Sequence, residues 1–107
     1  MKIGIVLNTN DKETCWNCFR FGNEALNNDH IVSIFLLGRG VEIEDVKDKK
    51  YNVQEQVKIF LENKGRIMAC GTCLQTREKE ASKVCPLSTL HEMLHMIEES
   101  EKILTFG

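Results

Sequence analysis

The chain has 107 residues, a length that allows one domain around a single core and leaves little room for an insertion. Its net charge is −2 and its pI is near 5.9. Charges of both signs are interspersed without a basic stripe, so the sequence provides no electrostatic support for nucleic-acid binding. No apolar segment approaches the ~18 residues of a membrane-spanning helix, and no signal-peptide cleavage site follows the first residues. We therefore expect a cytoplasmic protein without membrane contact.

The first strand and the first helix are predicted within residues 2–29. An apolar run over 2–7 predicts a strand, which ends at a polar turn. Asn10 and Glu13 in this turn have the spacing of a capping box and predict the start of a helix, which ends near 27–29. Its apolar positions recur at helical spacing: Cys15, Cys18, Phe19, Gly22, Ala25 and Leu26.

The middle of the chain predicts a second strand and a second helix. The strand spans 31–37, and the charge-rich segment 42–50 is predicted as a surface loop. Asn52 and Glu55 form another capping pair, and Gly65 is typical of a helix C-terminus. The helix between them is lined by Val53, Val57, Phe60 and Leu61.

The last third begins with a strand over 66–69 that leads into a cysteine. A short polar helix is predicted for roughly 72–81, followed by a loop over 82–86. Ser88 is predicted to cap a final helix, and 102–106 to form the closing strand. The inner face of the final helix is expected to carry Leu90, Met93, Leu94 and Ile97.

The alternation of strands and helices predicts the fold. Strands that are apolar throughout are buried on both faces, and strands joined by helices are normally parallel. We therefore predict one domain over 1–107. Its fold is expected to be a three-layer α/β/α sandwich with a mainly parallel sheet of about four to five strands. Ligands of such sheets bind at the carboxyl ends of the strands. These ends carry Asn8, Thr9 and Asn10, then Gly38, Arg39 and Gly40, then Cys70 and Gly71.

Cys70 is the first candidate for chemistry. It follows an apolar run and precedes a helix, where unpaired N–H groups and the helix dipole favour a thiolate and lower the thiol pKa. Cys73 lies one turn later on the same helical face and could resolve or share whatever Cys70 attacks. With five cysteines, an odd number, the sequence argues for reduced thiols, metal ligation or redox chemistry rather than for a disulfide framework.

Two further residues belong to this candidate site. Cys85 precedes Pro86 and lies in a predicted loop, where it is either a partly buried thiol or, if the loop folds back over the sheet edge, a neighbour of Cys70. Arg77 follows Cys70 by two helical turns. It either steadies the thiolate or an anionic sulfur species, or is a solvated surface residue.

Two strings in the sequence match metal-binding motifs. The pairs Cys15/Cys18 and Cys70/Cys73 invite comparison with a tetrathiolate zinc site, but Cys15 and Cys18 fall inside an apolar helical face, where cysteine packs as a small hydrophobe. The string from His91 to His95 matches His-Glu-x-x-His of metalloproteases, which also need a third ligand and a substrate cleft. We interpret these histidines as bordering the outer face of the last helix.

Several segments together resemble the DsrE/DsrF-like family, which includes the TusD-type sulfur relay subunits. The resemblance covers nearly the whole chain and is most specific between Ala69 and Arg77. It implies that Cys70, seven residues before an arginine, is the persulfide-carrying cysteine, and it implies cytoplasmic sulfur transfer and assembly into trimers or hexamers. The resemblance is carried by Phe35-Leu36-Leu37-Gly38-Arg39-Gly40-Val41, by Ala69-Cys70-Gly71-Thr72-Cys73 with Arg77, and by Lys102-Ile103-Leu104-Thr105-Phe106.

The chain departs from the relay subunits in its number of thiols. Those subunits carry a single reactive cysteine, whereas this chain offers Cys70 and Cys73 together. The run Cys85-Pro86-Leu87-Ser88-Thr89 resembles a cysteine-richer subset of the family. The pair leaves open a dithiol function in place of a simple carrier.

The favoured function is a sulfur carrier or sulfurtransferase. Cys70 would accept sulfane sulfur as a persulfide and pass it to the thiol of a donor or acceptor protein, with Cys73 or Cys85 releasing the sulfur or forming a protecting disulfide. We expect a homo-oligomer and neither cofactor nor bound metal. The candidate substrate-binding residues are Asn8, Thr9, Asn10, Arg39, Gly71 and Arg77.

Other functions stay open at this point. One is a metal- or redox-binding module without turnover, built from Cys70, Cys73 and Cys85. Another is a regulatory or structural subunit whose cysteines are incidental. A thioredoxin-like reductase fits less well, because no tryptophan precedes the Cys-Gly-Thr-Cys pair.

Overall fold

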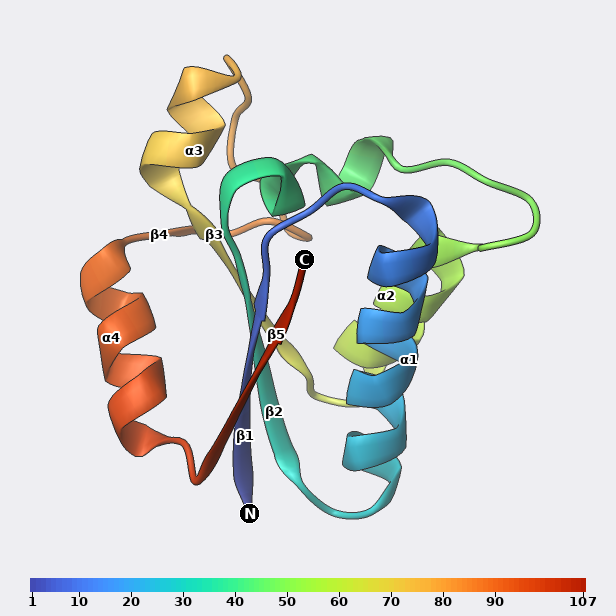
Figure 1. Ribbon diagram of the computed structural model, residues 1–107, viewed down its shortest axis with the longest axis vertical. Coiled ribbons are helices and arrows are strands. Elements are labelled where there is room, and N and C mark those ends of the chain that lie inside the picture. Colours follow the sequence, from blue (N-terminus) through green and yellow to red (C-terminus); the bar gives the residue numbers. More distant parts are fainter.

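The computed structural model describes residues 1–107 and consists of a five-stranded sheet with helices on both of its faces (Figure 1). In chain order the elements are β1 (Lys2–Leu7), α1 (Lys12–Asn27), β2 (Ile31–Leu36), the 3₁₀ helix η1 (Gly38–Asp45), α2 (Val53–Glu62), β3 (Arg66–Cys70), α3 (Gly71–Thr76), β4 (Leu87–Ser88), α4 (Leu90–Glu99) and β5 (Lys102–Phe106). No helix is both long enough and apolar enough to cross a membrane.

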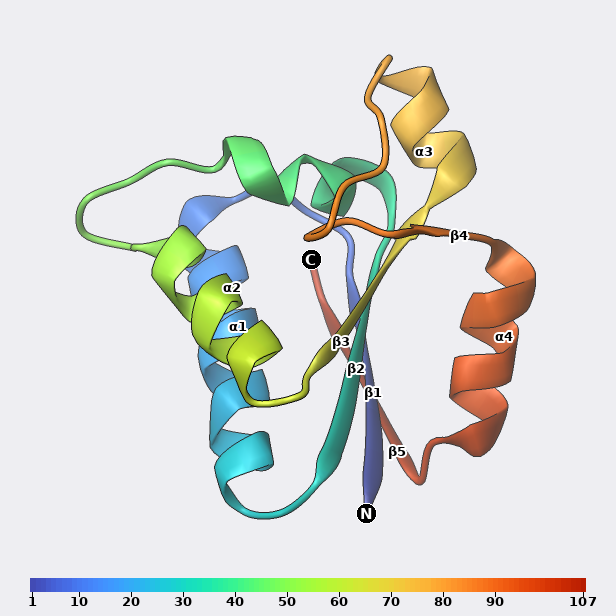
Figure 2. The ribbon, with the colours of Figure 1, turned by 180° about the vertical axis from the view of Figure 1, so that it is seen from behind.

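All five strands run parallel, in the order β4-β3-β2-β1-β5. The helices α1 and α2 cover one face of the sheet and α4 covers the other, while η1 and α3 lie beyond the carboxyl ends of the strands (Figures 1 and 2). This arrangement confirms the predicted three-layer α/β/α sandwich. The register aligns Leu7, Leu36 and Ala69, so β1, β2 and β3 end at one edge of the sheet.

The central strands are buried on both faces, as their continuous apolar sequences predict. From α1, the side chains of Cys15, Cys18 and Phe19 are fully buried in this core. Phe19 meets Phe60 of α2 edge to face, with 5.5 Å between the ring centroids. The strands contribute Ile5, Leu7, Val32, Ile34, Phe35, Leu36, Ile67 and Ala69.

Side-chain caps begin three of the helices close to the predicted positions. Asp11, rather than Asn10, caps α1, and its carboxylate accepts a backbone N–H of the first turn at 2.9 Å. Asn52 caps α2 as predicted. Thr89, rather than Ser88, caps α4. In each case the polar turn residue identifies the helix start to within one position.

The segment 42–50, predicted as a surface loop, begins inside η1. Val41 and Ile43 are buried, whereas Glu42 and Glu44 between and after them are half-buried. A 3₁₀ helix of eight residues is too short and too irregular to produce a periodic pattern, and its position here depends on contacts with the sheet edge. Only the residues after Asp45 form an irregular loop.

Two helices end earlier than predicted. The helix α2 ends at Glu62, three residues before Gly65, and α3 ends at Thr76 rather than near residue 81. Each end is followed by a non-glycine residue in the left-handed conformation, Lys64 at φ 71° and Glu78 at φ 54°. The usual glycine signal for a helix C-terminus is therefore missing or displaced at both ends.

The helix α4 covers the sheet less completely than the sequence predicts. Met96 is its one buried residue and Met93 is half-buried, whereas Leu90, Leu94 and Ile97 are exposed, with Leu90 at 61% and Leu94 at 54%. The prediction that all four apolar residues face the core is therefore wrong. The apolar arc of this helix is wider than its contact with the sheet, and the rest of the arc has no partner in the single chain.

Burial of the α1 thiols predicts a loss of stability at alkaline pH. Burial, and secondarily the negative charge of Asp11, raise the pKa of Cys15 to about 12, and burial also raises the pKa of Cys18. Unfolded thiols titrate near ~8.5, so above that pH the unfolded chain releases protons that the folded chain retains. The free energy of unfolding then falls by up to about 1.4 kcal/mol per pH unit and thiol. We expect the urea midpoint to fall between pH 8 and pH 10, and to fall less in Cys15→Ala. Equal falls in both proteins would contradict this assignment.

Candidate functional site

The carboxyl edge of the sheet gathers the turn after β1, the helix η1 after β2 and the helix α3 after β3 (Figure 1). Cys70 ends β3 and is the N-cap of α3. Its side chain is 3% exposed and lines a cavity of about 480 Å³ between α3 and the start of α4. The largely buried thiol thus borders a pocket that opens to the surface. The other lining residues are Gly71, Thr72, Gln75, Leu87, Ser88, Thr89 and Leu90.

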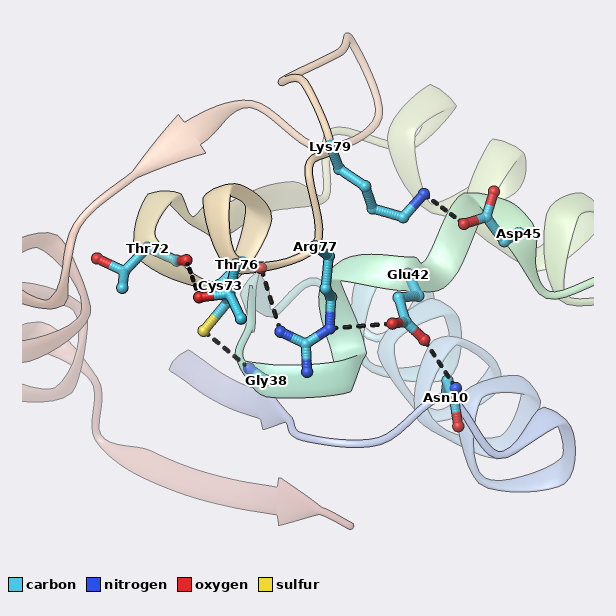
Figure 3. A network of polar contacts seen from close by, with 9 residues as sticks. All are labelled: Asn10, Gly38, Glu42, Asp45, Thr72, Cys73, Thr76, Arg77 and Lys79. Carbon is cyan, nitrogen blue, oxygen red and sulfur yellow. Dashed lines mark hydrogen bonds and ion pairs between the residues drawn. The ribbon is translucent and has the colours of Figure 1, made fainter.

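Cys73 lies in the first turn of α3 and is half-buried. Its Sγ accepts a hydrogen bond from the backbone N–H of Gly38 at 3.2 Å (Figure 3). Burial, followed by the neighbouring Cys70 thiol, raises the pKa of Cys73 above its ordinary value, whereas the Gly38 N–H and the charge of Arg77 act in the opposite direction. One hydrogen-bond donor and one positive charge therefore favour the Cys73 thiolate, while burial and the Cys70 thiol favour the protonated form.

Two glycines allow the N–H of Gly38 to reach this sulfur. Gly38 has a left-handed backbone conformation with φ 55°, and a Cβ at this position would collide with Oδ1 of Asn8. A Cβ at Gly40 would collide with the carbonyl oxygen of Leu7. The close approach of η1 to the end of β1 thus requires glycine at both positions, and this approach fixes the direction of the Gly38 N–H.

Arg77 joins three segments of the site. Its Nε donates to Oε2 of Glu42 at 2.9 Å, and its Nη1 donates to the carbonyl of Cys73 at 3.1 Å (Figure 3). Asn10 Nδ2 donates to the other oxygen of the same carboxylate at 2.8 Å. The guanidinium is thereby held beside Cys73, and the predicted site residues Asn10 and Arg77 are connected through Glu42, which the sequence interpretation missed.

The segment after α3 is held to η1 by further polar contacts. Lys79 forms an ion pair with Asp45, and Ser82 Oγ donates to Glu44 Oε1 at 2.6 Å (Figure 3 for the ion pair). These side chains lie shortly after Thr76, where α3 ends, and contact η1. An acidic run over 42–45 facing basic residues at 77 and 79 is the sequence signal that could have identified this contact.

Cys85 is buried beside the acidic end of η1. Burial, followed by the negative charge of Glu44, raises the pKa of Cys85 to about 12. The Ser82 hydroxyl and Lys79 are its other polar neighbours. No group of three or more His, Cys, Asp or Glu side chains is arranged to hold a metal ion. Because Cys15 and Cys18 are buried in the core as well, the geometry supports neither a tetrathiolate zinc site nor a metal module built from the remaining cysteines.

The other candidate substrate-binding residues lie in the turns around these thiols. Thr9 Oγ1 accepts the backbone N–H of Asp11 at 3.0 Å, and the backbone N–H of Asn8 donates to the carbonyl of Phe106 at 2.9 Å. Arg39 is exposed and forms no ion pair. Asn8 and Thr9 therefore shape the turn after β1, and no carboxylate fixes the guanidinium of Arg39.

His91 and His95 are exposed on α4. His95 Nε2 pairs with Glu99 Oε1 at 3.1 Å, one turn later on the same surface. The His-Glu-x-x-His string lacks a third converging ligand. Its histidines thus lie on the surface of a helix whose buried contact is made by Met96.

Replacing both histidines tests this interpretation. In His91→Gln/His95→Gln we expect the thermal midpoint, the thiol reactivity and the metal content of the purified protein to match those of the wild type, because an exposed pair contributes at most about 1 kcal/mol. Loss of a bound metal in the double variant would mean that the string is a metal site after all.

Comparison with known proteins gives one family match and relatives without an assigned activity. The model of the DsrE/DsrF-like family matches residues 1–106. An uncharacterized protein of Methanocaldococcus jannaschii is 30% identical over 101 residues, which cover 89% of each chain. An uncharacterized protein of Methanopyrus kandleri is 27% identical over 101 residues, 89% of this chain and 84% of the relative.

Among solved structures, the fold matches a conserved protein of unknown function from Bacteroides thetaiotaomicron. The TM-score is 0.78 over 98% of this chain and 94% of the other, with 20% identity. At that identity the match supports the fold alone.

Proposed function

Since the chain belongs to the DsrE/DsrF-like family, we propose that it is a sulfur carrier or sulfurtransferase-like protein in which Cys70 holds sulfane sulfur as a persulfide. The family is associated with sulfur relay. The observation that carries the proposal is the position of Cys70, a buried thiol at the end of β3 that lines a cavity and has a second thiol one turn away.

The cavity suits the loading step. A small sulfur donor can enter an open pocket of about 480 Å³ and reach the Cys70 thiol in its wall. In this step the Cys70 thiolate attacks the outer sulfur of a donor persulfide. The donor's sulfur–sulfur bond breaks, the donor leaves as a thiolate, and a new sulfur–sulfur bond forms on Cys70. One persulfide is consumed and one is formed, so no oxidant or reductant is needed.

A second thiol then releases the sulfur: its thiolate attacks the inner sulfur of the Cys70 persulfide, hydrosulfide leaves, and the disulfide that forms protects the site. Cys73 is better placed for this role than Cys85, because it lies one helical turn from Cys70 in α3 and is half-buried. Cys85 is 1% exposed and has Glu44 and Ser82 as neighbours. Its participation would require the segment between α3 and β4 to move.

The assignment of Cys70 predicts where sulfur is found. Brief exposure to a small alkylating agent near pH 7 should label Cys70 ahead of Cys15 and Cys18, whose raised pKa values keep them protonated. Treatment with inorganic polysulfide should add sulfur mass at Cys70, as located by peptide mass mapping. Cys70→Ser should abolish the adduct.

Cys15→Ala is the matched control and should retain the adduct. Sulfur found on Cys85, or retained by the Cys70→Ser protein, would show that the site assignment is wrong even if the protein carries sulfur.

We also propose that the protein is a homo-oligomer, a trimer or a hexamer as the family resemblance implies. The exposed apolar residues Leu87, Leu90, Leu94 and Ile97 at β4 and on α4 support association, because single chains rarely leave such clusters uncovered. Light scattering should give a multiple of the 12.3 kDa chain mass, and Leu94→Asp should lower it more than Ile31→Asp, which changes an exposed apolar residue on β2. A monomer mass for the wild type at micromolar concentration would defeat this prediction.

A further inference from the structure

Two thiols of unequal exposure lie next to one another at the end of β3. Cys70 is 3% exposed and lines the cavity, whereas Cys73 is half-buried and faces η1. We propose that Cys73 is a second sulfur-carrying residue, called here the second sulfur station. The sulfur loaded on Cys70 moves to Cys73, where the Gly38 N–H and Arg77 hold it, and it leaves from Cys73 to a protein acceptor. This inference rests on the proposed function and deepens it by separating the entry thiol from the exit thiol.

The first support is the donor that already faces Cys73. The Gly38 N–H lies 3.2 Å from Sγ and is fixed in direction by the left-handed conformation of Gly38. Hydrogen bonds from a backbone N–H to an anionic acceptor are about twice as strong as those between neutral groups. The Cys73 thiolate, which is the nucleophile that receives the sulfur, is therefore stabilised by a group that needs no rearrangement.

The second support is an unused donor on Arg77. The guanidinium is anchored by Nε on Glu42 and by Nη1 on the carbonyl of Cys73, while Nη2 donates no hydrogen bond within the protein (Figure 3). The bond from Nη1 holds the positive charge of Arg77 at the backbone of Cys73. A terminal sulfur added to Cys73 extends the side chain by one atom and is attracted by this charge, and Nη2 has no bond within the protein to give up in donating to that sulfur.

The transfer between the two thiols balances in atoms, charge and electrons. The Cys73 thiol first gives its proton to the persulfide on Cys70. The Cys73 thiolate then attacks the outer sulfur, the sulfur–sulfur bond on Cys70 breaks, and a new one forms on Cys73. Cys70 leaves as a thiolate and takes the proton of the new persulfide, whose terminal sulfur is then anionic. No external oxidant or reductant takes part.

Two sulfur acceptors of different size can distinguish sulfur that leaves from Cys73 from sulfur that remains on Cys70. Protein loaded with polysulfide is allowed to react either with cyanide, which is small enough to reach both thiols, or with cysteamine coupled to agarose beads, which meets only sulfur at the protein surface. We expect the ratio of bead transfer to cyanide reaction to fall at least ten-fold in Cys73→Ser. Fragment-ion mapping of the loaded wild type should find the added sulfur on Cys73 as well as on Cys70.

The donors are tested with a matched pair of substitutions. Arg77→Gln should lower the bead-to-cyanide ratio several-fold, whereas Lys79→Gln, which removes the other ion pair between the same segment and η1, should leave it at the wild-type value. Gly38→Ala should shift the mapped sulfur towards Cys70, because a side chain strains the left-handed backbone at φ 55° and turns the N–H away from Cys73. Arg77→Gln keeps the test valid if the glycine variant does not fold.

The possible failures are distinguishable. If wild-type protein takes up no sulfur, the proposed function itself is wrong. If sulfur loads on Cys70 and Cys73→Ser passes it to the beads as readily as the wild type, the two-station mechanism is wrong and the carrier function stands. If Lys79→Gln lowers the ratio as much as Arg77→Gln, the effect comes from loosening the segment, and the assignment of Arg77 is overturned.

Discussion

The register of the parallel sheet is the constraint on which the site depends. Because Leu7, Leu36 and Ala69 are aligned, the segments that follow β1, β2 and β3 all emerge at one edge. The strands hold this register because they are apolar on both faces, and a slip by one residue would move every side chain to the opposite face. Each of the segments is therefore free to carry polar groups, glycines and thiols without a cost to the core.

Complementary charge then fixes these segments to one another. The acidic side chains of η1 are contacted by three residues that follow α3. Arg77 and Lys79 form ion pairs with them, and Ser82 donates a hydrogen bond. Partly exposed ion pairs of this kind contribute at most about 1 kcal/mol each, so their importance is positional rather than energetic. Of these contacts, the bonds of Arg77 to Glu42 and to the carbonyl of Cys73 join η1 to α3 directly. That contact brings the Gly38 N–H to Cys73 and holds a guanidinium beside the same side chain.

The parts of this structure that could be predicted are those with local signals. The polar caps identified the helix starts to within one residue, and the apolar runs identified β1, β2, β3 and β5, because both signals lie in adjacent residues. The two-residue strand β4, the helix η1 and the end of α3 depend on contacts between distant segments, and no local pattern encodes them. The prediction that Leu90 and Leu94 of α4 face the core was wrong for a related reason. The apolar residues of a helix can be read from the sequence, but which of them the sheet covers depends on how the helix packs.

The two Cys-x-x-Cys pairs show that environment, rather than spacing, decides what a thiol can do. Cys15 and Cys18 are fully buried in α1, and Cys15 donates its S–H to the carbonyl of Thr9 at 3.4 Å. Burial raises both of their pKa values, so they behave as small apolar side chains. Cys70 and Cys73 have the same spacing, but one lines a cavity and the other accepts a backbone N–H beside a fixed positive charge. Of the two pairs, only the second has a hydrogen-bond donor and a cation beside one of its sulfurs, and these two groups oppose the rise that burial causes in the pKa of Cys73.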